Sequence, residues 1–272
     1  MQVISRPPTR IRHPLRLRMM QIARTEQASP HIRRIIFSGN ELEGFTTSAA
    51  DDHVKLFFPL PGHDRPVLPH LGPDGRNPAR EQDPAVIMRD YTVRHFDPDA
   101  GELTIEFVLH GDGPAATWAA QAQPGHWLGI GGPRGSFIIP DDYAAYLLMG
   151  DETALSAIAR RLAELPSTAH VTVMVEVADA RDERPLKTSS HATVHWLHRN
   201  GVPAGHSMVL PDALAAFSLT SPDTHAWIGA EIGIARHLRD LLLTEKGLPR
   251  DQVRAAGYWR LGAADGGARV ED

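Results

Sequence analysis

The first half of the chain carries short runs in which apolar and polar residues alternate, separated by turn residues. Alternation with a period of two is typical of half-buried strands. The runs predict strands at residues 16–22, 33–38, 54–58, 89–94 and 102–109. Strands with this spacing are typical of a small antiparallel β-barrel. The stretch 59–83 is rich in Pro, Gly and charge without periodicity, which predicts a long loop that either lines a site or is mobile.

The pattern changes after residue 141, where strands alternate with helical runs. The apolar periodicity predicts strands at 144–149, 170–177, 193–197, 226–229 and around 258–260, and helices at 153–165, 211–217 and 234–245. Strands and helices in alternation predict an α/β domain with a parallel sheet. We therefore expect two domains that meet near Tyr143, a barrel over residues 1–142 and an α/β domain over residues 143–272.

The composition excludes several kinds of function. The chain has 272 residues and a net charge of -5, which argues against a general nucleic-acid partner, although Arg residues gather between Arg6 and Arg34. It contains no cysteine. Disulfides, thiolate metal sites, cysteine-held iron–sulfur clusters and a cysteine nucleophile are thereby excluded, so any redox chemistry requires a bound cofactor.

The N-terminal residues, Met1 to Met20, lack the continuous apolar core of a secretory signal, and no stretch of the sequence has the length of a membrane span. We expect a cytoplasmic protein without membrane insertion. A mitochondrial transit peptide is the alternative for this Arg-rich start, but the alternation in residues 16–22 favours a first strand.

The segment from Gly111 to Ala119 follows a predicted strand and reads as a turn that leads into a helix, with Pro114 in the first turn and a hydroxyl at Thr117. A helix N-terminus can bind an anion through its free N–H groups and its dipole. The plainer interpretation is a turn followed by a capped helix, because such junctions are common.

The strand at 89–94 has the sequence Arg-Asp-Tyr-Thr-Val-Arg. Alternation places Arg89 and Tyr91 on one face, and Asp90, Thr92 and Arg94 on the other. An aromatic ring beside a guanidinium can stack on a planar ring system and neutralise a phosphate. A solvated strand face is the plainer alternative.

Several motifs in order give the chain a resemblance to a known family. They are the segments 89–94, 110–115 with Trp118, 131–137, 150–155, 227–231 with Arg236 and Arg239, and 257–262. Together they resemble the siderophore-interacting proteins, which are FAD-dependent ferric-siderophore reductases of the ferredoxin-reductase-like superfamily. The resemblance implies that the N-terminal barrel binds FAD and that the C-terminal domain binds NAD(P)H.

The resemblance also implies roles for individual residues. Arg89, Tyr91 and Thr92 would hold the flavin ring and the ribityl phosphate region, with Arg94 as a further contact from the opposite face. The turn from His110 to Thr117 would hold the pyrophosphate, and the implied FAD contacts there are His110, Gly113, Ala115, Thr117 and Trp118.

The implied substrate, a ferric siderophore, is often anionic, so cations near the flavin would hold it. Lys55 matches a family position implicated in substrate binding, and we add Arg134 and Arg260 as further candidates. Without the resemblance, each reads equally well as an ordinary surface cation. No catalytic acid or base is expected, because the cofactor carries the chemistry.

The best nucleotide-binding candidate is Gly150-Asp151-Glu152-Thr153, at the carboxyl end of an apolar strand and the start of a helix. Its carboxylates suit ribose hydroxyls or helix capping, so phosphate contacts would come from backbone N–H groups and Thr153. The glycine-rich segment 129–135 superficially matches a dinucleotide fingerprint, but a strand rather than a helix follows it. We therefore predict a loop of the barrel domain at this segment.

The electron donor is expected to be NADH or NADPH, with a ferredoxin as the alternative. NADPH is slightly favoured because Arg181 and Arg184 follow the second strand of the α/β domain and could meet a 2′-phosphate. Mixed charge at that position is also typical of a solvated turn.

Three histidines, His191, His195 and His198, have a spacing that approximates one face of a helix and could indicate a metal site. Strand alternation argues against this, because only His191 and His195 would share a face. We therefore predict structural or surface histidines and no metal ligands.

The expected function is transfer of electrons from NAD(P)H through FAD to Fe(III) in a siderophore, with release of Fe(II). One alternative is a reductase of the same fold that acts on free flavin or on a redox protein partner. Another alternative is a siderophore-binding protein that does not turn over.

Overall fold

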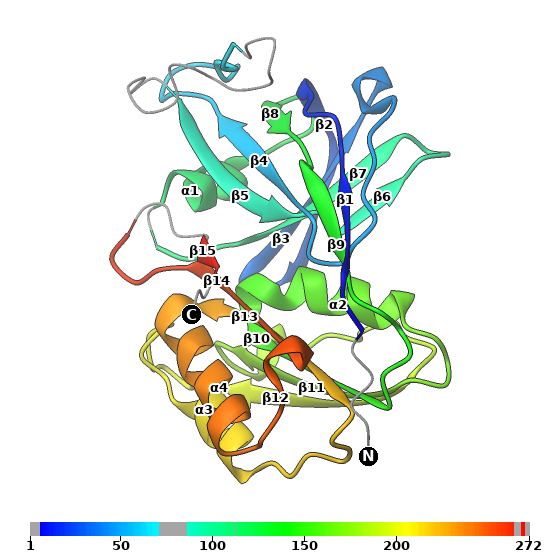
Figure 1. Cartoon of the computed structure of the whole chain (residues 1–272). Coiled ribbons are helices and arrows are strands. Elements are labelled where there is room, and N and C mark those ends of the chain that lie inside the picture. The colour runs from blue at the N-terminus through cyan, green and yellow to red at the C-terminus, as the bar shows by residue number, and fades with distance from the viewer. Residues whose placement is uncertain (1–5, 71–85, 112, 264–267, 270–272) are drawn as a thin grey trace. The chain divides into compact units, whose positions relative to one another are not determined.

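The computed structural model describes residues 6–70, 86–111, 113–263 and 268–269. Residues 71–83 of the expected long loop lie outside these ranges, and no strand or helix occurs in residues 59–70. The chain divides into two compact units (Figure 1). We call Thr9–Ile138 the N-terminal unit, and Ile139–Asp272 together with Met1–Pro8 the C-terminal unit.

The N-terminal unit is built on an antiparallel sheet of seven strands in the order β5-β4-β8-β2-β3-β7-β6. The bounds are β2 Leu17–Ser29, β3 Ile32–Ser38, β4 His53–Phe58, β5 Ile87–Thr92, β6 His95–Asp97, β7 Glu102–Val108 and β8 Trp127–Gly131. A short ribbon of β1 (Thr9–Arg12) and β9 (Gly135–Ile138), the 3-10 turn η1 (Asn40–Leu42) and the helix α1 (Pro114–Gln121) complete the unit. The antiparallel architecture expected from the alternation is confirmed.

The strand expected at 89–94 ends two residues early, at Thr92. The next N–H groups leave the pairing with β4: that of Val93 donates to the carbonyl of Asp52 at 2.8 Å, and that of Arg94 donates to the carbonyl of Thr104 at 3.0 Å. The chain therefore turns from β4 toward β7 at this point, which alternation alone does not reveal.

The sheet curls around its own core. Tyr91 of the edge strand β5 packs on Phe107 of β7, with ring centroids 4.5 Å apart, although four strands lie between β5 and β7 in the sheet order. Phe107, Ile105 and Leu56 are fully buried. Burial of each such side chain contributes about 1.5–3 kcal/mol. The core is therefore enclosed by one curved sheet, as in a barrel.

The C-terminal unit has a sheet in the order β12-β11-β10-β13-β14-β15, of which the first five strands are parallel. The strands are β10 Ala145–Asp151, β11 His170–Val177, β12 His191–His198, β13 Thr224–Glu231, β14 Val253–Trp259 and the antiparallel β15 Ala268–Arg269. The helices are α2 Leu155–Glu164, α3 Val209–Ala216 and α4 Ile232–Thr244, with 3-10 turns η2 Glu152–Ala154, η3 Ala180–Asp182 and η4 Arg250–Gln252. The parallel sheet and every helix and strand expected after residue 141 are confirmed.

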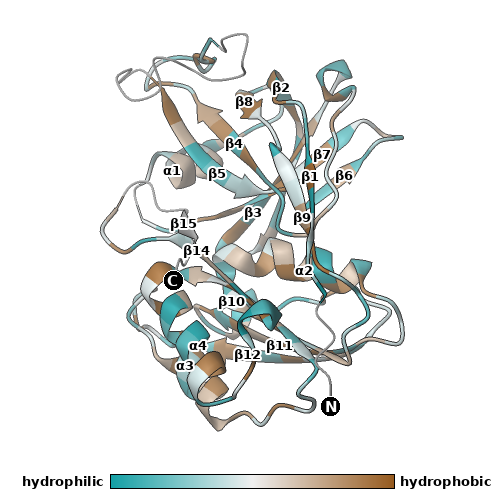
Figure 2. Ribbon diagram, in the orientation of Figure 1, coloured by the Kyte–Doolittle hydropathy of each residue, from teal (hydrophilic) through white to brown (hydrophobic). Residues whose placement is uncertain are grey.

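Helices cover both faces of this sheet. Leu210 of α3 and Leu238 of α4 share one apolar cluster with Met149 and Ile228 of the sheet, and α2 lies against the other face (Figure 1). Figure 2 shows hydrophobic and hydrophilic residues on different sides of α4, where Leu238 is buried and Arg236 is exposed. Within the described ranges, no helix combines the length and apolarity needed to cross a membrane.

The order of the strands reverses beside β10, which has β11 on one side and β13 on the other. In open α/β sheets, ligands bind outside the carboxyl ends of the strands at such a reversal. Two glycines bring the backbone close at this place. Gly150 of β10 and Gly229 of β13 are register partners, and a Cβ on Gly150 would lie 2.3 Å from the carbonyl oxygen of Gly229 and 2.6 Å from the Cβ of Ala154. Glycine therefore lets the turn η2 lie directly on the strand ends.

Candidate functional site

The N-terminal unit places the β5 residues on the faces that alternation predicts. Tyr91 pairs with Val54 and Arg89 with Leu56, whereas Asp90 pairs with Lys55. Tyr91 points into the core, and burial raises the pKa of its phenol above the ordinary value, so the phenol stays neutral and can donate a hydrogen bond. Arg89 Nη1 donates to the carbonyl of Met88 at 2.6 Å.

The other two residues expected here, Thr92 and Arg94, follow Tyr91 at the end of β5. Thr92 is buried at the end of β5. Arg94 follows the strand, and its Nε lies 4.0 Å from Oε1 of Glu106. The same carboxylate accepts hydrogen bonds from Arg34 at 2.7 and 3.1 Å. Arg94 therefore belongs to a charged cluster on β7 and β3.

The turn after β7 leads into α1, as expected. Gly111 has a left-handed φ of 56°, and Pro114 is the first residue of the helix. The Thr117 N–H donates to the carbonyl of Gly113 at 2.9 Å. Within the described residues, no side chain caps this end of the helix, and a Cβ added to Gly111 or Gly113 would meet no atom within 4 Å. The first turn is therefore open to an anionic ligand such as a diphosphate.

The rest of α1 anchors this turn to the core. Ala115 is buried, while Thr117 and His110 are exposed. Trp118 packs against Phe58 and Phe107, with ring centroids 5.5 and 5.7 Å apart. Because Phe107 also carries Tyr91, Trp118 and Tyr91 are held by one aromatic neighbour, and the helix is fixed relative to β5.

The expected substrate-binding cations occupy different surroundings. Lys55 Nζ contacts both carboxylate oxygens of Asp90, at 2.7 and 2.9 Å, on the opposite face of the strands from Tyr91. Arg134 is exposed in the turn after β8, and Arg260 is exposed after β14 in the C-terminal unit. In the described part of the chain neither arginine forms an ion pair.

Sequence reasoning missed further cations beside Arg134. Arg12 is the register partner of Gly135, and the carbonyl of Arg16 accepts a hydrogen bond from the Gly132 N–H at 3.2 Å. Both side chains are exposed. Arg18 is buried beneath them, and its Nε donates to the carbonyl of Glu41 at 2.8 Å. Burial, followed by the charge of Arg16, lowers the pKa of Arg18. Arg12, Arg16 and Arg18 of the Arg-rich N-terminal segment therefore lie next to the turn at residues 132–135.

The C-terminal unit places Asp151 at the end of β10, where it is 6% exposed. Its Oδ1 accepts from the N–H and the hydroxyl of Thr153, at 2.9 and 2.5 Å. Its Oδ2 accepts from the indole nitrogen of Trp259 at 2.8 Å and from the Glu231 N–H at 3.1 Å. Burial, followed by the charge of Glu152, raises the pKa of Asp151 to about 6.

Glu152 and Glu176 share a single guanidinium. Arg199, which follows β12, contacts the two carboxylate oxygens of Glu152 at 2.5 and 2.7 Å and Oε1 of Glu176 at 3.4 Å. Burial raises the pKa of Glu176 to about 7. The positive charge of Arg199 lowers this pKa, and the negative charge of Asp151 raises it further. Arg199 is buried too, so it compensates charges that would otherwise be costly to bury.

A fourth carboxylate lies at the end of β13. Glu231 caps α4 by accepting from the N–H groups of Gly233 and Ile234 at 2.5 and 3.2 Å, and it also accepts from the Leu261 N–H at 3.2 Å. The carboxyl ends of the parallel strands are therefore rich in hydrogen-bond acceptors. Such groups can bind sugar hydroxyls, whereas they repel phosphates.

Some groups expected to bind phosphate are engaged within the chain. The N–H and hydroxyl of Thr153 both donate to Asp151. Arg181 contacts the carboxylate of Asp179 through Nε at 2.9 Å and Nη2 at 2.7 Å. The helix-capping role that the sequence allows for the Gly150–Thr153 turn matches these contacts, with Asp151 as the capping residue.

Two family models match the chain, one for each unit. Residues 21–137 match the siderophore-interacting FAD-binding domain, and residues 143–262 match the siderophore-interacting protein. An NADPH-dependent ferric-chelate reductase of Escherichia coli (strain K12) is 36% identical over 93% of this chain and 97% of its own length. The chain belongs to the siderophore-interacting protein family. The resemblance read from the motifs is thereby confirmed.

Solved structures agree with the family and with the fold. A siderophore utilization protein from T. fusca matches with a TM-score of 0.89 and 41% identity, over 94% of this chain and 97% of the other. A ferredoxin reductase of carbazole 1,9a-dioxygenase matches with a TM-score of 0.62 and 18% identity, over 89% of this chain and 69% of the other. This siderophore-interacting protein therefore has a ferredoxin-reductase-like fold, an antiparallel FAD-binding domain followed by a parallel α/β domain.

Proposed function

We propose that this siderophore-interacting protein is a ferric-siderophore reductase that draws electrons from NADPH through FAD. The observation that carries the proposal is the uncapped, open first turn of α1, held beside Tyr91 by a shared aromatic core, in a domain of the FAD-binding family. Support for the substrate and the donor comes from the similar ferric-chelate reductase, whose name states NADPH dependence.

The residues of the N-terminal unit fit FAD. The N–H groups in the turn from His110 to Thr117 that make no intrahelical hydrogen bond would hold the diphosphate, because the space beside Gly111 and Gly113 is open. Arg89 would neutralise a phosphate charge, and Tyr91, Thr92 and Trp118 would border the ring system. When bound, FAD accepts two electrons from a reduced nicotinamide and passes single electrons to Fe(III).

The residues of the C-terminal unit would orient the electron donor. The carboxylates at the strand ends, Asp151 and Glu152 among them, would border the ribose hydroxyls rather than the phosphates. We propose residues 143–272 as the nucleotide-binding domain and residues 1–142 as the FAD-binding domain. The protein would act in the cytoplasm, where the NADPH pool is available.

The cations Lys55, Arg134 and Arg260 would attract an anionic ferric chelate. Reduction to Fe(II) weakens binding by an oxygen-rich chelator, because the lower charge interacts less strongly with hard anionic ligands. The metal would then leave for cellular use. No side chain has to move a proton in this scheme.

One experiment tests the whole proposal. The purified protein is examined for a flavin absorption spectrum, then titrated anaerobically with NADH and NADPH in separate runs, and finally mixed with ferric chelates. We expect a flavin spectrum that NADPH bleaches faster than NADH and that a ferric siderophore restores. A bound flavin that neither nucleotide reduces would favour a ferredoxin donor, and colourless protein that binds a siderophore would overturn the enzymatic proposal.

A further inference from the structure

Two histidines lie side by side at the amino-terminal edge of the parallel sheet. His170 begins β11 and His191 begins β12, and the two residues are register partners. Their rings stack with centroids 5.2 Å apart and planes inclined by 20°. Both side chains are exposed. In the described ranges of the chain, neither imidazole hydrogen-bonds or ion-pairs with another group, so both rings can accept an external ligand.

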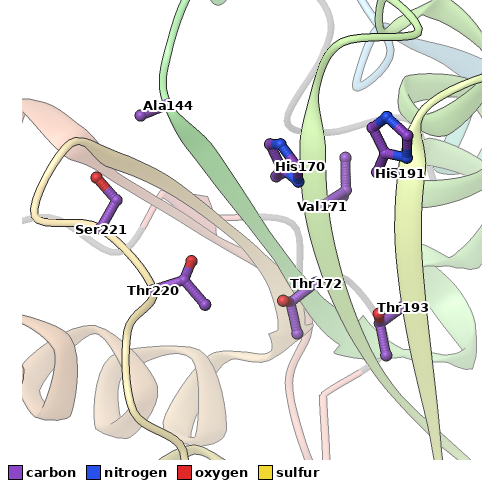
Figure 3. A pocket seen from close by; sticks show the side chains of 8 residues that line it. All are labelled: Ala144, His170, Val171, Thr172, His191, Thr193, Thr220 and Ser221. Carbon is purple, nitrogen blue, oxygen red and sulfur yellow. The ribbon is translucent and has the colours of Figure 1, made fainter.

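The imidazole pair borders a polar cavity of about 290 Å³. Figure 3 shows the two rings on adjacent strands, with Thr172 and Thr193 further along the same strands and with Thr220 and Ser221 on a separate loop. Thr172 and Thr193 are themselves register partners. Among the described residues, those that line the cavity include no carboxylate and no Lys or Arg. Its chemistry is therefore that of two imidazoles and several hydroxyl groups.

This combination favours a metal cation over an anion. An anion would require protonated imidazoles, and two cationic rings 5.2 Å apart would repel each other. Neutral imidazoles each offer a nitrogen lone pair, which is the ligand that Cu²⁺, Ni²⁺ and Zn²⁺ accept. Bonds of about 2.0–2.1 Å to a common ion require the two ring nitrogens to converge, and exposed side chains can do so by rotation without backbone movement.

We propose that His170 and His191 form a two-histidine site for a divalent transition metal ion, with water completing the coordination. The hydroxyls of Thr172 and Thr193 would hold that water. In the part of the chain that the structure describes, no group of three or more His, Cys, Asp or Glu side chains could hold a metal, so the site keeps exchangeable positions. The ordering of affinities would be Cu²⁺ above Ni²⁺ and Zn²⁺.

The spacing of histidines in the sequence instead drew attention to His191, His195 and His198. Within β12, residues His191 and His195 share a face but lie four positions apart on an extended strand, which separates them by about 13 Å. The partner of His191 is instead His170 on the neighbouring strand. The proposed site is formed by strand register, is separate from the iron substrate, and does not depend on the proposed reductase activity.

The test is titration of the chelator-treated, full-length protein with Cu²⁺ and with Ni²⁺ by calorimetry, with electron paramagnetic resonance of the Cu²⁺ complex. Variants His170→Gln, His191→Gln and the double variant are compared with His195→Gln, an exposed histidine of the same strand. We expect the wild type to bind one equivalent of the metal ion. Its affinity should fall at least about tenfold in each single variant and should be unchanged in the His195→Gln control. The wild-type spectrum should show coupling to two nitrogens.

Each of the remaining outcomes decides the question. Unchanged affinity and coupling in the double variant would overturn the proposal, because the chain has 15 histidines and the signal would then come from others. The proposal would also be overturned if the wild type bound no metal ion more tightly than the double variant does. Circular dichroism of each variant confirms that it is folded.

Discussion

The indole nitrogen of Trp259 donates a hydrogen bond to Oδ2 of Asp151 at 2.8 Å, across 108 residues of sequence. Asp151 ends β10 and Trp259 ends β14, with β13 between them in the sheet. The same carboxylate oxygen accepts from the Glu231 N–H at the end of β13. One buried acid therefore joins three strands where we propose that the nucleotide binds.

Replacement of Trp259 by Phe should destabilise the protein by about 1–3 kcal/mol, because it leaves a buried acceptor with one donor fewer. Urea unfolding measures this loss. The control is Trp196→Phe on β12, whose indole nitrogen has no hydrogen-bond partner among the described residues and which loses only apolar area. Equal losses in the two variants would contradict a specific contribution of the bond to Asp151.

Replacement of Gly150 by Ala should destabilise the C-terminal unit, because the new Cβ would lie 2.3 Å from the carbonyl oxygen of Gly229. Overpacking of this kind costs about 1–3 kcal/mol or more, which corresponds to a fall in Tm of about 2–4 °C per kcal/mol for a chain of this size. Thermal unfolding is the measurement. Gly113→Ala is the control, since a Cβ there meets nothing within 4 Å, and it should change Tm far less.

Stability should depend on the ionisation of Glu176. Its pKa in the folded protein rises from an ordinary 4.5 to about 7, so its protonated form is favoured by folding. This contribution is fully present below about pH 4.5 and is lost as the pH rises through about 7. Relative to Glu176→Gln, the free energy of unfolding of the wild type should therefore fall by up to about 1.4 kcal/mol per pH unit between about pH 4.5 and pH 7.

Urea unfolding of both proteins at several pH values checks this difference, with the exposed Glu245→Gln as the surface control. The difference in free energy of unfolding between the wild type and Glu176→Gln should become constant above pH 7. A difference that is already constant from pH 4.5 to pH 7 would contradict the raised pKa.

Asp90 should weaken the attraction of Lys55 for an anionic chelate, because its carboxylate already contacts the ammonium at 2.7 and 2.9 Å. Asp90→Asn should raise kcat/KM for anionic ferric chelates about two- to fivefold, in line with the ~0.5–1 kcal/mol of a partly exposed charge pair. Lys55→Gln should lower it. Neutral chelates should respond to neither change, and the gain should shrink as salt is added.

Asp99→Asn serves as the control, since Asp99 is exposed in the turn before β7 and has no cation partner among the described residues. Equal effects of Asp90→Asn on neutral and anionic chelates would contradict an electrostatic role. Failure of the wild type to reduce any chelate would instead contradict the proposed function.

The sequence was informative where a physical pattern is local. Alternation identified β2, β3, β4, β5 and β7 of the N-terminal unit, β10 to β14 of the C-terminal unit, and the shared face of Arg89 and Tyr91. It missed β1, β6 and β15, and it also missed β8, whose last residues fall in the glycine-rich segment read as a loop. The position of Pro114 indicated where α1 begins. The resemblance supplied the family because its motifs are contiguous. These features depend on residues within a few positions of one another.

Contacts between strands could not be predicted in the same way. The Lys55–Asp90 pair depends on register, the His170–His191 pair depends on which strands become neighbours, and Asp151 meets Trp259 only after five strands are ordered. The early end of β5 at Thr92 likewise depends on the distant carbonyls of Asp52 and Thr104. Register and strand order decide these contacts, and a local sequence pattern determines neither of them.

The position of Asp151 has a consequence for motion at the strand ends. Because its two oxygens accept from Thr153, Glu231 and Trp259, opening any one of these segments leaves a buried carboxylate short of a donor. Local fluctuations at the ends of β10, β13 and β14 are therefore coupled into one cooperative unit. The Thr153 and Glu231 amides and the Trp259 indole N–H should exchange with deuterium at a common rate, as a single foldon.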